Sequence, residues 1–359
     1  MAKFNWSASD YRDPLMPNGF NDGAYWQREL YATASLLYAP TEHMSFDYSA
    51  DYSFNNLNSS LKTDVRPYRH TVLQSFTAKY AGRRLTVMAR LLWSLYLNDS
   101  RNGESARNMR RLSPSLSLSY RLVNNYDFFV RVSYKNIFRA PTFNENYYFH
   151  YGNPDLQPEA TDQFNLGLTW QHHFGSHTTA RITADGYVNH VKDKIVAMPH
   201  NMFVWTCVNI ERVKSYGADF TLKFSHRFNV RHAVTADAGY SHIIAENRAD
   251  SESSDYGKQL AYTPRNSASF SIGYENPWVS LSFHGYGISS RWANNEHYRG
   301  TEIDGFWDFG ITAWHDFRLA RHNLHVRLDL KNLFGKQYEI VSFYPMPRRN
   351  YLVTIKYNI

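Results

Sequence analysis

Apolar and polar residues alternate along most of the chain with a period of two, which is typical of strands that have one apolar and one polar face. Between residues 85 and 95, Leu85, Ala89 and Trp93 share one side, while Arg90 and Ser94 share the other with Arg84 just before them. We expect the first side to face lipid and the second to face the lumen of a barrel. Fifteen such segments predict an all-β fold: 28–38, 43–54, 68–80, 83–96, 112–122, 126–135, 162–174, 178–190, 212–226, 231–245, 264–275, 277–289, 304–315, 322–332 and 349–359.

The connections between these segments alternate between short and long. Short turns are predicted around Pro40, Gly82, 124–125, 175–176, Asn229, 276–277 and 319–321. Long loops are predicted near 55–67, 97–111, 136–161, 191–211, 246–263, 290–303 and 333–348. This alternation predicts an antiparallel up-and-down transmembrane β-barrel, because a Greek-key sandwich mixes its loop lengths.

The parity of the strands predicts one more strand at the start of the chain. The first counted segment descends from the long-loop side, so a rising strand should precede it. Phe4, Trp6 and Ala8 alternate and fit that strand, with 10–27 as its loop. We therefore expect about fifteen to sixteen strands over residues 1–359 and no residues left for an N-terminal globular domain. Residues 1–20 contain neither a continuous apolar core nor a small-residue cleavage site, so no signal peptide is visible.

Composition narrows the class further. The chain has 27 Tyr, 23 Phe and 9 Trp, a heavy aromatic load, and its single cysteine excludes a disulfide framework. The mean hydropathy of −0.55 and the absence of long apolar runs exclude a helical membrane protein. The net charge of +7 is scattered along the sequence, so we expect no nucleic-acid partner.

Two short boxes inside the loop at 136–161 resemble those of TonB-dependent outer-membrane receptors. The first box reads FRAP at 138–141, and the second reads GNPDLQPE at 152–159. The three prolines of these boxes, which interrupt ladder pairing, are consistent with a long structured loop. The motif residues are Phe138, Arg139, Pro141, Asn153, Pro154, Leu156, Pro158 and Glu159.

The end of the chain also resembles this family. The segment KNLF at 331–334 is followed by Tyr338, and PMP at 345–347 precedes the last strand, although Arg348 replaces the glycine that is common in the family. Residues 186–197 (GYVNHVKDKIVA) and 202–205 look most like the vitamin B12 (cobalamin) receptor branch of Bacteroides-type bacteria.

The resemblance implies a protein of the Gram-negative outer membrane. Members have 22 barrel strands and an N-terminal plug, so the chain corresponds to the C-terminal part of a 22-stranded barrel, with the plug domain missing. The implied partners are the TonB–ExbB–ExbD complex, which acts through the missing plug, a small metal-chelate ligand, a surface lipoprotein and outer-membrane lipid. No cofactor is implied.

The chemistry of the side chains points to binding and not to catalysis. Phosphate loops, zinc-spaced Cys/His sets and nucleophile elbows are absent from the sequence, so we expect no enzyme. The aromatic loop at 147–151 offers rigid contact area, and His150 could ligate a metal. The alternative is that these aromatic side chains pack the loop against its neighbours or belong to the interfacial girdle.

We expect the long loops 136–161, 191–211, 290–303 and 333–348 to meet at one extracellular mouth with an aromatic rim. The expected ligand-binding residues are Tyr147, Tyr148, His150, Tyr151, Phe203, Trp205, Trp292 and Tyr344. Such a rim suits a flat, partly apolar macrocycle, so the expected function is uptake of a scarce metal chelate: cobalamin first, then haem or a ferric siderophore. The alternative function is a passive porin-like channel, because about sixteen strands is a porin number.

Overall fold

A computed structural model of the protein describes residues 1–11, 23–60, 65–123, 127–148, 152–199, 205–319 and 322–358. The chain divides into two compact units, which are described separately. Unit 1 comprises 1–119, 133–164 and 189–213. Unit 2 comprises 120–132, 165–188 and 214–359.

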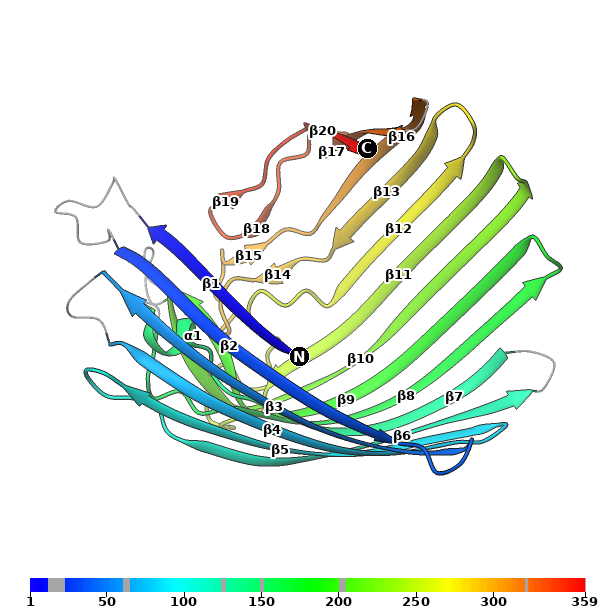
Figure 1. The fold of residues 1–359 in the computed structure, drawn as a ribbon. Helices are drawn as coiled ribbons and strands as arrows, with labels where there is room; N and C mark the ends of the chain where they lie inside the picture. The colour runs from blue at the N-terminus through cyan, green and yellow to red at the C-terminus, as the bar shows by residue number, and fades with distance from the viewer. Residues whose placement is uncertain are drawn as a thin grey trace. The chain divides into compact units, whose positions relative to one another are not determined.

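The main element is an antiparallel sheet of sixteen strands in the order β1-β2-β3-β4-β5-β6-β7-β8-β9-β10-β11-β12-β13-β16-β17-β20 (Figure 1). The bounds of the first eight strands are Ala2–Tyr11, Gly23–Tyr38, Met44–Ser59, Pro67–Ala81, Leu85–Ser100, Met109–Val123, Asp127–Arg139 and Glu159–Phe174. The bounds of the other eight are Thr178–Pro199, Trp205–Asn229, His232–Asn247, Asn266–Glu275, Ser280–Ile288, Phe306–Leu319, His322–Lys331 and Asn350–Asn358.

The all-β, antiparallel fold class is confirmed. Each of the fifteen predicted segments corresponds to one strand of the main sheet, and β1 is the additional rising strand that parity required. Each strand pairs with the strand next to it in the chain, except where a short hairpin intervenes. No helix in the described part of the chain is long and apolar enough to cross a membrane.

The register of β4 and β5 in unit 1 separates the two faces as predicted. Trp93 lies opposite Gln74 and Ala89 opposite Ala78, whereas Arg90 lies opposite Thr77 on the other face. The Arg90 Nε donates to the Thr77 Oγ1 at 3.1 Å, and Ser94 is buried. Leu91 and Leu97, which share the apolar face, are each 43% exposed, so this face requires an apolar medium around it.

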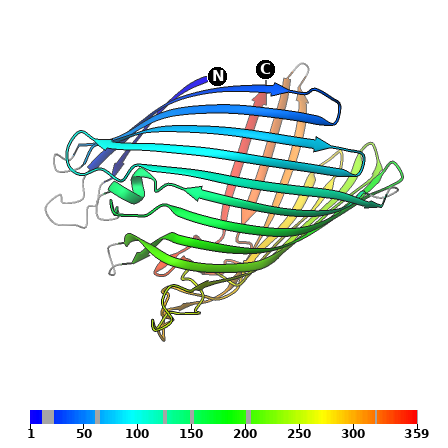
Figure 2. The same cartoon turned by 90° about the horizontal axis from the view of Figure 1, so that it is seen from below.

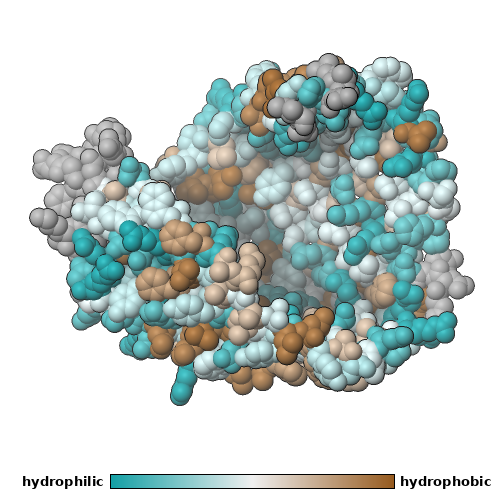
Figure 3. Space-filling view, viewed as in Figure 1, coloured by the Kyte–Doolittle hydropathy of each residue, from teal (hydrophilic) through white to brown (hydrophobic). Residues whose placement is uncertain are grey.

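The last strands of unit 2 show the same separation. Leu328 lies opposite Val353, and Val326 opposite Ile355, on a face where Val353 and Ile355 are largely exposed. Arg327 and Asp329 point to the other face. In Figure 3 the visible face of the unit 2 strands at the right is mostly teal and white, as expected for the polar side.

The long connections carry small elements of their own. Helix α1 (Phe143–Tyr147) lies between β7 and β8, and two hairpins, β14 (Arg291–Trp292) with β15 (Glu302–Ile303) and β18 (Glu339–Val341) with β19 (Tyr344–Pro345), occupy later connections.

The expected loop at 191–211 is wrong over most of its length, because β9 continues to Pro199 and β10 begins at Trp205. Spanning a bilayer needs about 10 residues of strand. The 22 residues of β9 and the 25 of β10 therefore extend beyond that length. Because the two strands stay paired there, their backbone N–H and C=O groups form hydrogen bonds with each other, whereas in a loop these groups would need other partners.

Candidate ligand-binding site

Helix α1 begins where the first box ends, at the long-connection end of the unit 1 strands (Figure 2). Pro141 is fully buried, and Thr142 caps the helix in an extended conformation. The Thr142 hydroxyl accepts from the Glu145 N–H at 3.2 Å, and the Glu145 carboxylate accepts from the Thr142 N–H at 2.8 Å. This reciprocal capping box fixes a helix too short to be stable alone.

Arg139 of the first box joins the helix to the second box. Its Nη1 donates to both Glu145 oxygens at 2.9 Å, and its Nη2 donates to the Glu159 Oε2 at 3.3 Å. Glu159 also accepts from the Ile195 N–H at 3.3 Å and lies 3.6 Å from the Lys194 Nζ. We call this group of Arg139, Glu145 and Glu159 the charge clamp, because it links the first box, helix α1 and the second box and so closes the loop.

The charge clamp lowers the pKa of the Glu145 carboxyl. Burial raises the pKa of its carboxyl, but the Thr142 N–H and the Arg139 guanidinium lower it by more, so the pKa of Glu145 lies below its ordinary value. The carboxylate is therefore charged in the folded loop, as the clamp requires.

The second box is held by packing and by backbone contacts. A Cβ on Gly152 would lie 2.5 Å from the Tyr147 N, so this position needs glycine. The Asn153 Nδ2 donates to the Cys207 carbonyl at 3.1 Å. Leu156 is buried in a cluster with Ile195 and Cys207.

The two described tyrosines of the aromatic loop pack against unit 1. Tyr148 stacks on Tyr25 with ring centroids 4.5 Å apart. The Tyr147 hydroxyl accepts from the Ala106 N–H at 2.5 Å, and both rings pack on the buried cluster that includes Phe143. Burial raises the pKa of Tyr147 despite the opposing effects of the Ala106 N–H and Arg69. Both tyrosines are thus in a packing role, and contact with a ligand stays a prediction.

Two buried polar side chains were missed by sequence reasoning: Arg69 of β4, beside α1, and Asn146 within α1. Arg69 is 9% exposed, donates to the Asn98 Oδ1 at 2.6 Å and to the Pro141 carbonyl at 2.8 Å, and lies 5.1 Å from the Phe143 ring centroid. Its Nη2 has no hydrogen-bond partner among the described residues, and neither amide atom of Asn146 has one. Nothing in the alternating pattern distinguishes Arg69 from other polar-face residues.

A cavity of about 390 Å³ lies beside the two boxes in unit 1. One wall is formed by motif residues, including Phe138, Pro141 and Leu156. Another is formed by the start of β6 and the residues just before it, with the arginines Arg107, Arg110 and Arg111. No Asp or Glu is among the described residues that line it. Arginine forks match carboxylate and phosphate groups, so the cavity suits an anionic group of a ligand next to an apolar surface.

Unit 2 places the other predicted residues in its two hairpins. Trp292 in β14 stacks on His297, with centroids 4.7 Å apart. The neighbouring Arg291 is buried and donates to the carbonyls of Glu339 at 2.6 Å and Ile340 at 2.8 Å, which fixes the β18–β19 hairpin.

The tip of the β18–β19 hairpin is the most exposed aromatic surface at these sites. Tyr344 is 66% exposed, and Phe343, which the sequence analysis did not select, is 81% exposed. Phe343 has a φ of 68°, a strained value for an aromatic residue, and its N–H donates to the Glu339 carboxylate at 2.9 Å. Because such strain persists only where the surroundings hold it, the hairpin presents a preformed tip.

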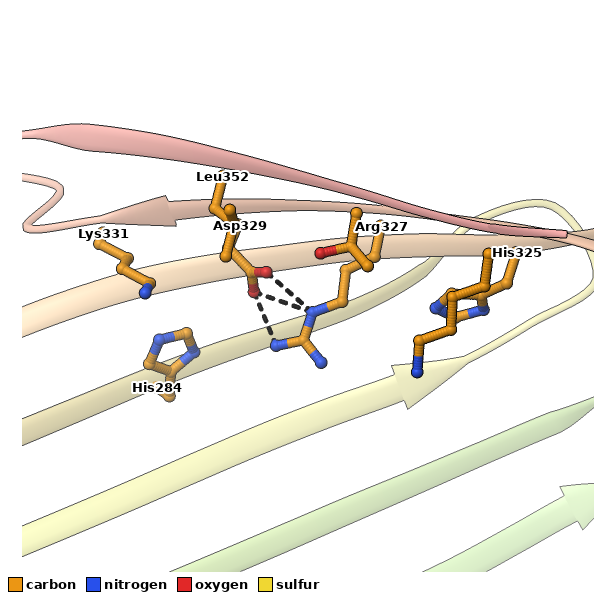
Figure 4. Close-up of a pocket in the computed structure, with 8 residues that line it drawn as sticks. His284, His325, Arg327, Asp329, Lys331 and Leu352 are labelled. Atoms are coloured by element: carbon orange, nitrogen blue, oxygen red, sulfur yellow. Dashed lines mark hydrogen bonds and ion pairs between the residues drawn. The ribbon is translucent and has the colours of Figure 1, made fainter. Parts of the chain in front are cut away.

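A second cavity in unit 2, of about 380 Å³, lies on the polar face of β13, β17 and β20 (Figure 4). Arg327 donates to Asp329 through its Nε and Nη2, and Asp329 also accepts from the Thr312 hydroxyl at 2.6 Å. The remaining polar lining is basic or neutral: His284, His325, Lys331, Thr354 and Lys356. The cavity is a polar surface with excess positive charge.

The remaining predicted residues cannot be placed as a rim. His150, Tyr151 and Phe203 lie outside the described residues, and Trp205 is the first residue of β10. Tyr147, Tyr148 and Trp205 belong to unit 1, whereas Trp292 and Tyr344 belong to unit 2. The convergence of the loops stays a prediction.

Comparisons with known proteins agree with this fold. The family model described as "TonB dependent receptor-like, beta-barrel" matches residues 2–333. The vitamin B12 transporter BtuB of Photobacterium profundum is 25% identical over 228 residues, which cover 61% of this chain and 34% of the relative. An iron-regulated outer membrane virulence protein of Vibrio cholerae is 29% identical over 152 residues, 38% of this chain and 22% of that protein.

Solved structures show the same architecture. The copper transporter OprC superposes with a TM-score of 0.74 at 15% identity, covering 99% of this chain and 61% of OprC. The FrpB iron transporter from Neisseria meningitidis superposes with a TM-score of 0.68 at 14% identity, covering 93% of this chain and 55% of FrpB. At such identities the likeness concerns the fold alone.

The chain is therefore part of an outer-membrane β-barrel. It belongs to the TonB-dependent receptor family. It spans about a third of the length of the BtuB relative (34%).

Proposed function

We propose that the chain is the barrel portion of a receptor that takes up a scarce metal chelate across the outer membrane. Cobalamin is the favoured ligand, followed by haem or a ferric siderophore. Energy would come from the TonB–ExbB–ExbD complex through a plug domain encoded with the barrel, and a surface lipoprotein is a further proposed partner. The BtuB likeness and the resemblance of 186–197 support cobalamin, whereas the iron-regulated relative supports an iron chelate.

The observation that carries this proposal is the arginine-lined cavity beside the two boxes. Its lining joins Arg107, Arg110 and Arg111 to an apolar wall, and the charge clamp and α1 hold that wall in place. Metal chelates commonly combine anionic groups with apolar surface, and a cavity of this kind can recognise both. The observation supports the chelate class without selecting one member.

The aromatic residues supply the second part of the proposed site. We retain Tyr147, Tyr148, His150, Tyr151, Phe203, Trp205, Trp292 and Tyr344 as the proposed ligand-binding set. Phe343 joins that set because of its exposure and its fixed backbone. Exposed, preorganised aromatic side chains contribute most to binding, because little conformational freedom is lost when they meet a ligand.

The test is equilibrium binding to the receptor as its gene encodes it, with cyanocobalamin, haem and several ferric siderophores as separate ligands. Two variants report on the two parts of the site: Tyr147/Tyr148/Tyr151→Ala for the aromatic loop and Arg107/Arg110/Arg111→Gln for the cavity. We expect one ligand to bind tightly and each variant to weaken it about tenfold or more. Arg248→Gln, an arginine of another loop paired with Glu246, is the matched control.

Three outcomes would contradict parts of the proposal. Unchanged affinity in the tyrosine variant would remove this loop from the site. Absence of cobalamin binding would leave haem or iron chelates. Ion conductance without saturable binding of any chelate would favour the passive channel, for which a sixteen-stranded sheet is also a suitable size.

A further inference from the structure

Five histidines of unit 2 lie on the apolar face of the sheet close to the short connections. They are His172 in β8, His226 in β10, His232 in β11, His315 in β16 and His322 in β17. His232 and His322 are the first residues of their strands, and the other three lie within four residues of a strand end. The β8–β9, β10–β11 and β12–β13 turns mark that end of unit 2 at the right of Figure 1.

Strand register fixes the face of these histidines. His315 lies opposite Val326, and His322 opposite Leu319, in the pairing of β16 with β17. On β8, His172 has the parity of Leu166 and Leu168, which are 57% and 42% exposed. The histidines therefore share the face whose large apolar side chains are exposed.

Each imidazole is packed against an aromatic side chain of the same face. The ring-centroid distances are 4.4 Å for His172–Phe174, His226–Phe228 and His315–Phe317, 5.4 Å for His322–Tyr357, and 5.9 Å for His232 with both Tyr274 and Trp278. All five histidines are half-buried by this packing. We call these five histidines and the rings that they contact the histidine–aromatic belt.

Hydrogen bonds through Nδ1 hold the rings of His226 and His232 in fixed orientations. The His226 Nδ1 lies 2.7 Å from the Thr178 Oγ1, and the His232 Nδ1 lies 2.7 Å from the Tyr274 hydroxyl. A hydroxyl that donates to Nδ1 leaves the imidazole proton on Nε2, and neither Nε2 has a partner among the described residues.

In the part of the strands nearer to the short connections, this face carries no formal charge; Lys214 of β10 and Glu246 of β11, which have the same parity, lie toward the other end. At the positions of the same parity, the described strands of unit 2 carry no Asp, Glu, Lys or Arg over the ranges 166–174, 178–188, 216–228, 232–244, 268–274, 281–287, 307–317, 322–330 and 351–357. The other titratable side chains there are tyrosines and His242. At the short-connection end, the belt histidines are therefore the main nitrogen donors that this face offers.

We propose that the histidine–aromatic belt is a binding site for the phosphate groups of phospholipids, at the edge of the membrane where the short connections lie. The lipid acyl chains would cover the exposed apolar face that continues from the belt, and the imidazole N–H groups would donate to phosphate oxygens. An aromatic belt alone is general among membrane barrels. What is specific to this protein is that histidine side chains in the belt donate hydrogen bonds to lipid phosphate groups.

The chemistry favours phosphate over the other groups at that depth. Imidazole N–H donors form stronger hydrogen bonds with an ionised oxygen than with a neutral ester carbonyl. Packing against a ring fixes each imidazole, so little side-chain freedom is lost on binding. Lys and Arg reach phosphate too, but the described ranges given above carry neither on this face, so histidine supplies the donors there.

The test measures phospholipid bound to the receptor as its gene encodes it, extracted from the outer membrane in mild detergent. Lipid phosphorus per protein and native mass spectrometry report the amount and identity of the lipid. In the fivefold His→Phe variant, which keeps a ring and removes the donors, we expect about tenfold less phospholipid. The fivefold His→Gln variant keeps a donor and should retain more phospholipid than the Phe variant.

The matched control is His173→Phe, a histidine at the same end of β8 whose parity places it on the polar face, and this variant should retain the wild-type amount. If the fivefold Phe variant fails to assemble, His315→Phe with His322→Phe takes its place, with a smaller loss in the same direction expected. Unchanged phospholipid in the Phe variants, an equal loss in the control, or retention of lipopolysaccharide in place of phospholipid would overturn the proposal.

Discussion

Two loops of this protein hold their aromatic residues in opposite ways. In unit 1, the charge clamp of Arg139, Glu145 and Glu159 closes the α1 loop, and Tyr147 and Tyr148 pack inward. In unit 2, Arg291 fixes the β18–β19 hairpin through two backbone carbonyls, and the aromatic side chains at its tip point outward to solvent.

This difference in packing indicates which aromatic side chains are available to a ligand. A ring that already packs against its own chain must give up those contacts before it can bind, whereas an exposed ring on a fixed backbone does not. We therefore expect substitutions in the α1 loop to act first on stability, and substitutions at the hairpin tip to act first on affinity.

The largest effect is expected for Arg139→Ala. The substitution removes three hydrogen bonds and leaves Glu145 and Glu159, both mostly buried, without their main cation. We expect a loss of about 3 kcal/mol in the stability of the loop, because charged groups left unpaired and buried are costly. Hydrogen exchange of the α1 amides measures it.

The matched control for that substitution is Arg121→Ala. Arg121 pairs with Asp127 through a single contact of 3.3 Å between side chains that are 37% and 42% exposed. Exposed pairs contribute about 0–1 kcal/mol, so this variant should leave the α1 amides protected as in the wild type. Equal exchange in Arg139→Ala and the wild type would show that packing alone holds the loop.

A somewhat smaller effect is expected for Gly152→Ala. The added Cβ would lie 2.5 Å from the Tyr147 N and 2.6 Å from the Tyr148 N, so backbone must move. We expect a cost of about 2 kcal/mol in the unfolding free energy of the loop, as for other forced overpacking. Gly186→Ala, where the nearest atom is 3.9 Å away, is the control and should be close to neutral.

A purely functional effect is expected at the hairpin tip. Phe343→Ala with Tyr344→Ala should weaken ligand binding about tenfold by isothermal titration and leave thermal stability unchanged, because both rings are exposed. Val230→Ala removes an exposed apolar side chain from a short turn and should change neither quantity. A loss of stability without a loss of affinity in the double variant would reverse the division between the two loops.

Most of the fold could be predicted from the sequence because one rule governs every strand. The face of a strand that contacts lipid must be apolar, whereas the opposite face need not be. The resulting alternation of apolar and polar residues predicts strands such as Leu85–Ser100. The rule fails where strands leave the bilayer. Beyond it both faces meet water and alternation weakens, so the pattern predicts a loop where the end of β9 and the start of β10 continue as strands.

The candidate site was less predictable. The two boxes identified the motif residues, but the pattern could not show that Arg139 joins Glu145 to Glu159 across the loop. Arg69 and Arg291 act through contacts with residues distant in the chain, at Pro141 and Glu339. Phe343 differs from neighbouring aromatic residues only in its backbone conformation, which the amino-acid type does not reveal.

The smallest predicted effect is the pH dependence of the α1 loop. The pKa of Glu145 is lowered in the folded loop because the Thr142 N–H and Arg139 outweigh the effect of burial. A lowered pKa means that Glu145 contributes stability above its unfolded value of about 4.3, and that this contribution is lost as the pH falls through the folded pKa. After correction for intrinsic exchange rates, protection of the α1 amides should therefore decrease by about 1 kcal/mol below about pH 4. Glu145→Gln should show weaker protection at neutral pH and no such decrease. A wild-type profile as flat as that of the Gln variant would mean that Glu145 holds the loop through its shape and hydrogen bonds and not through its charge.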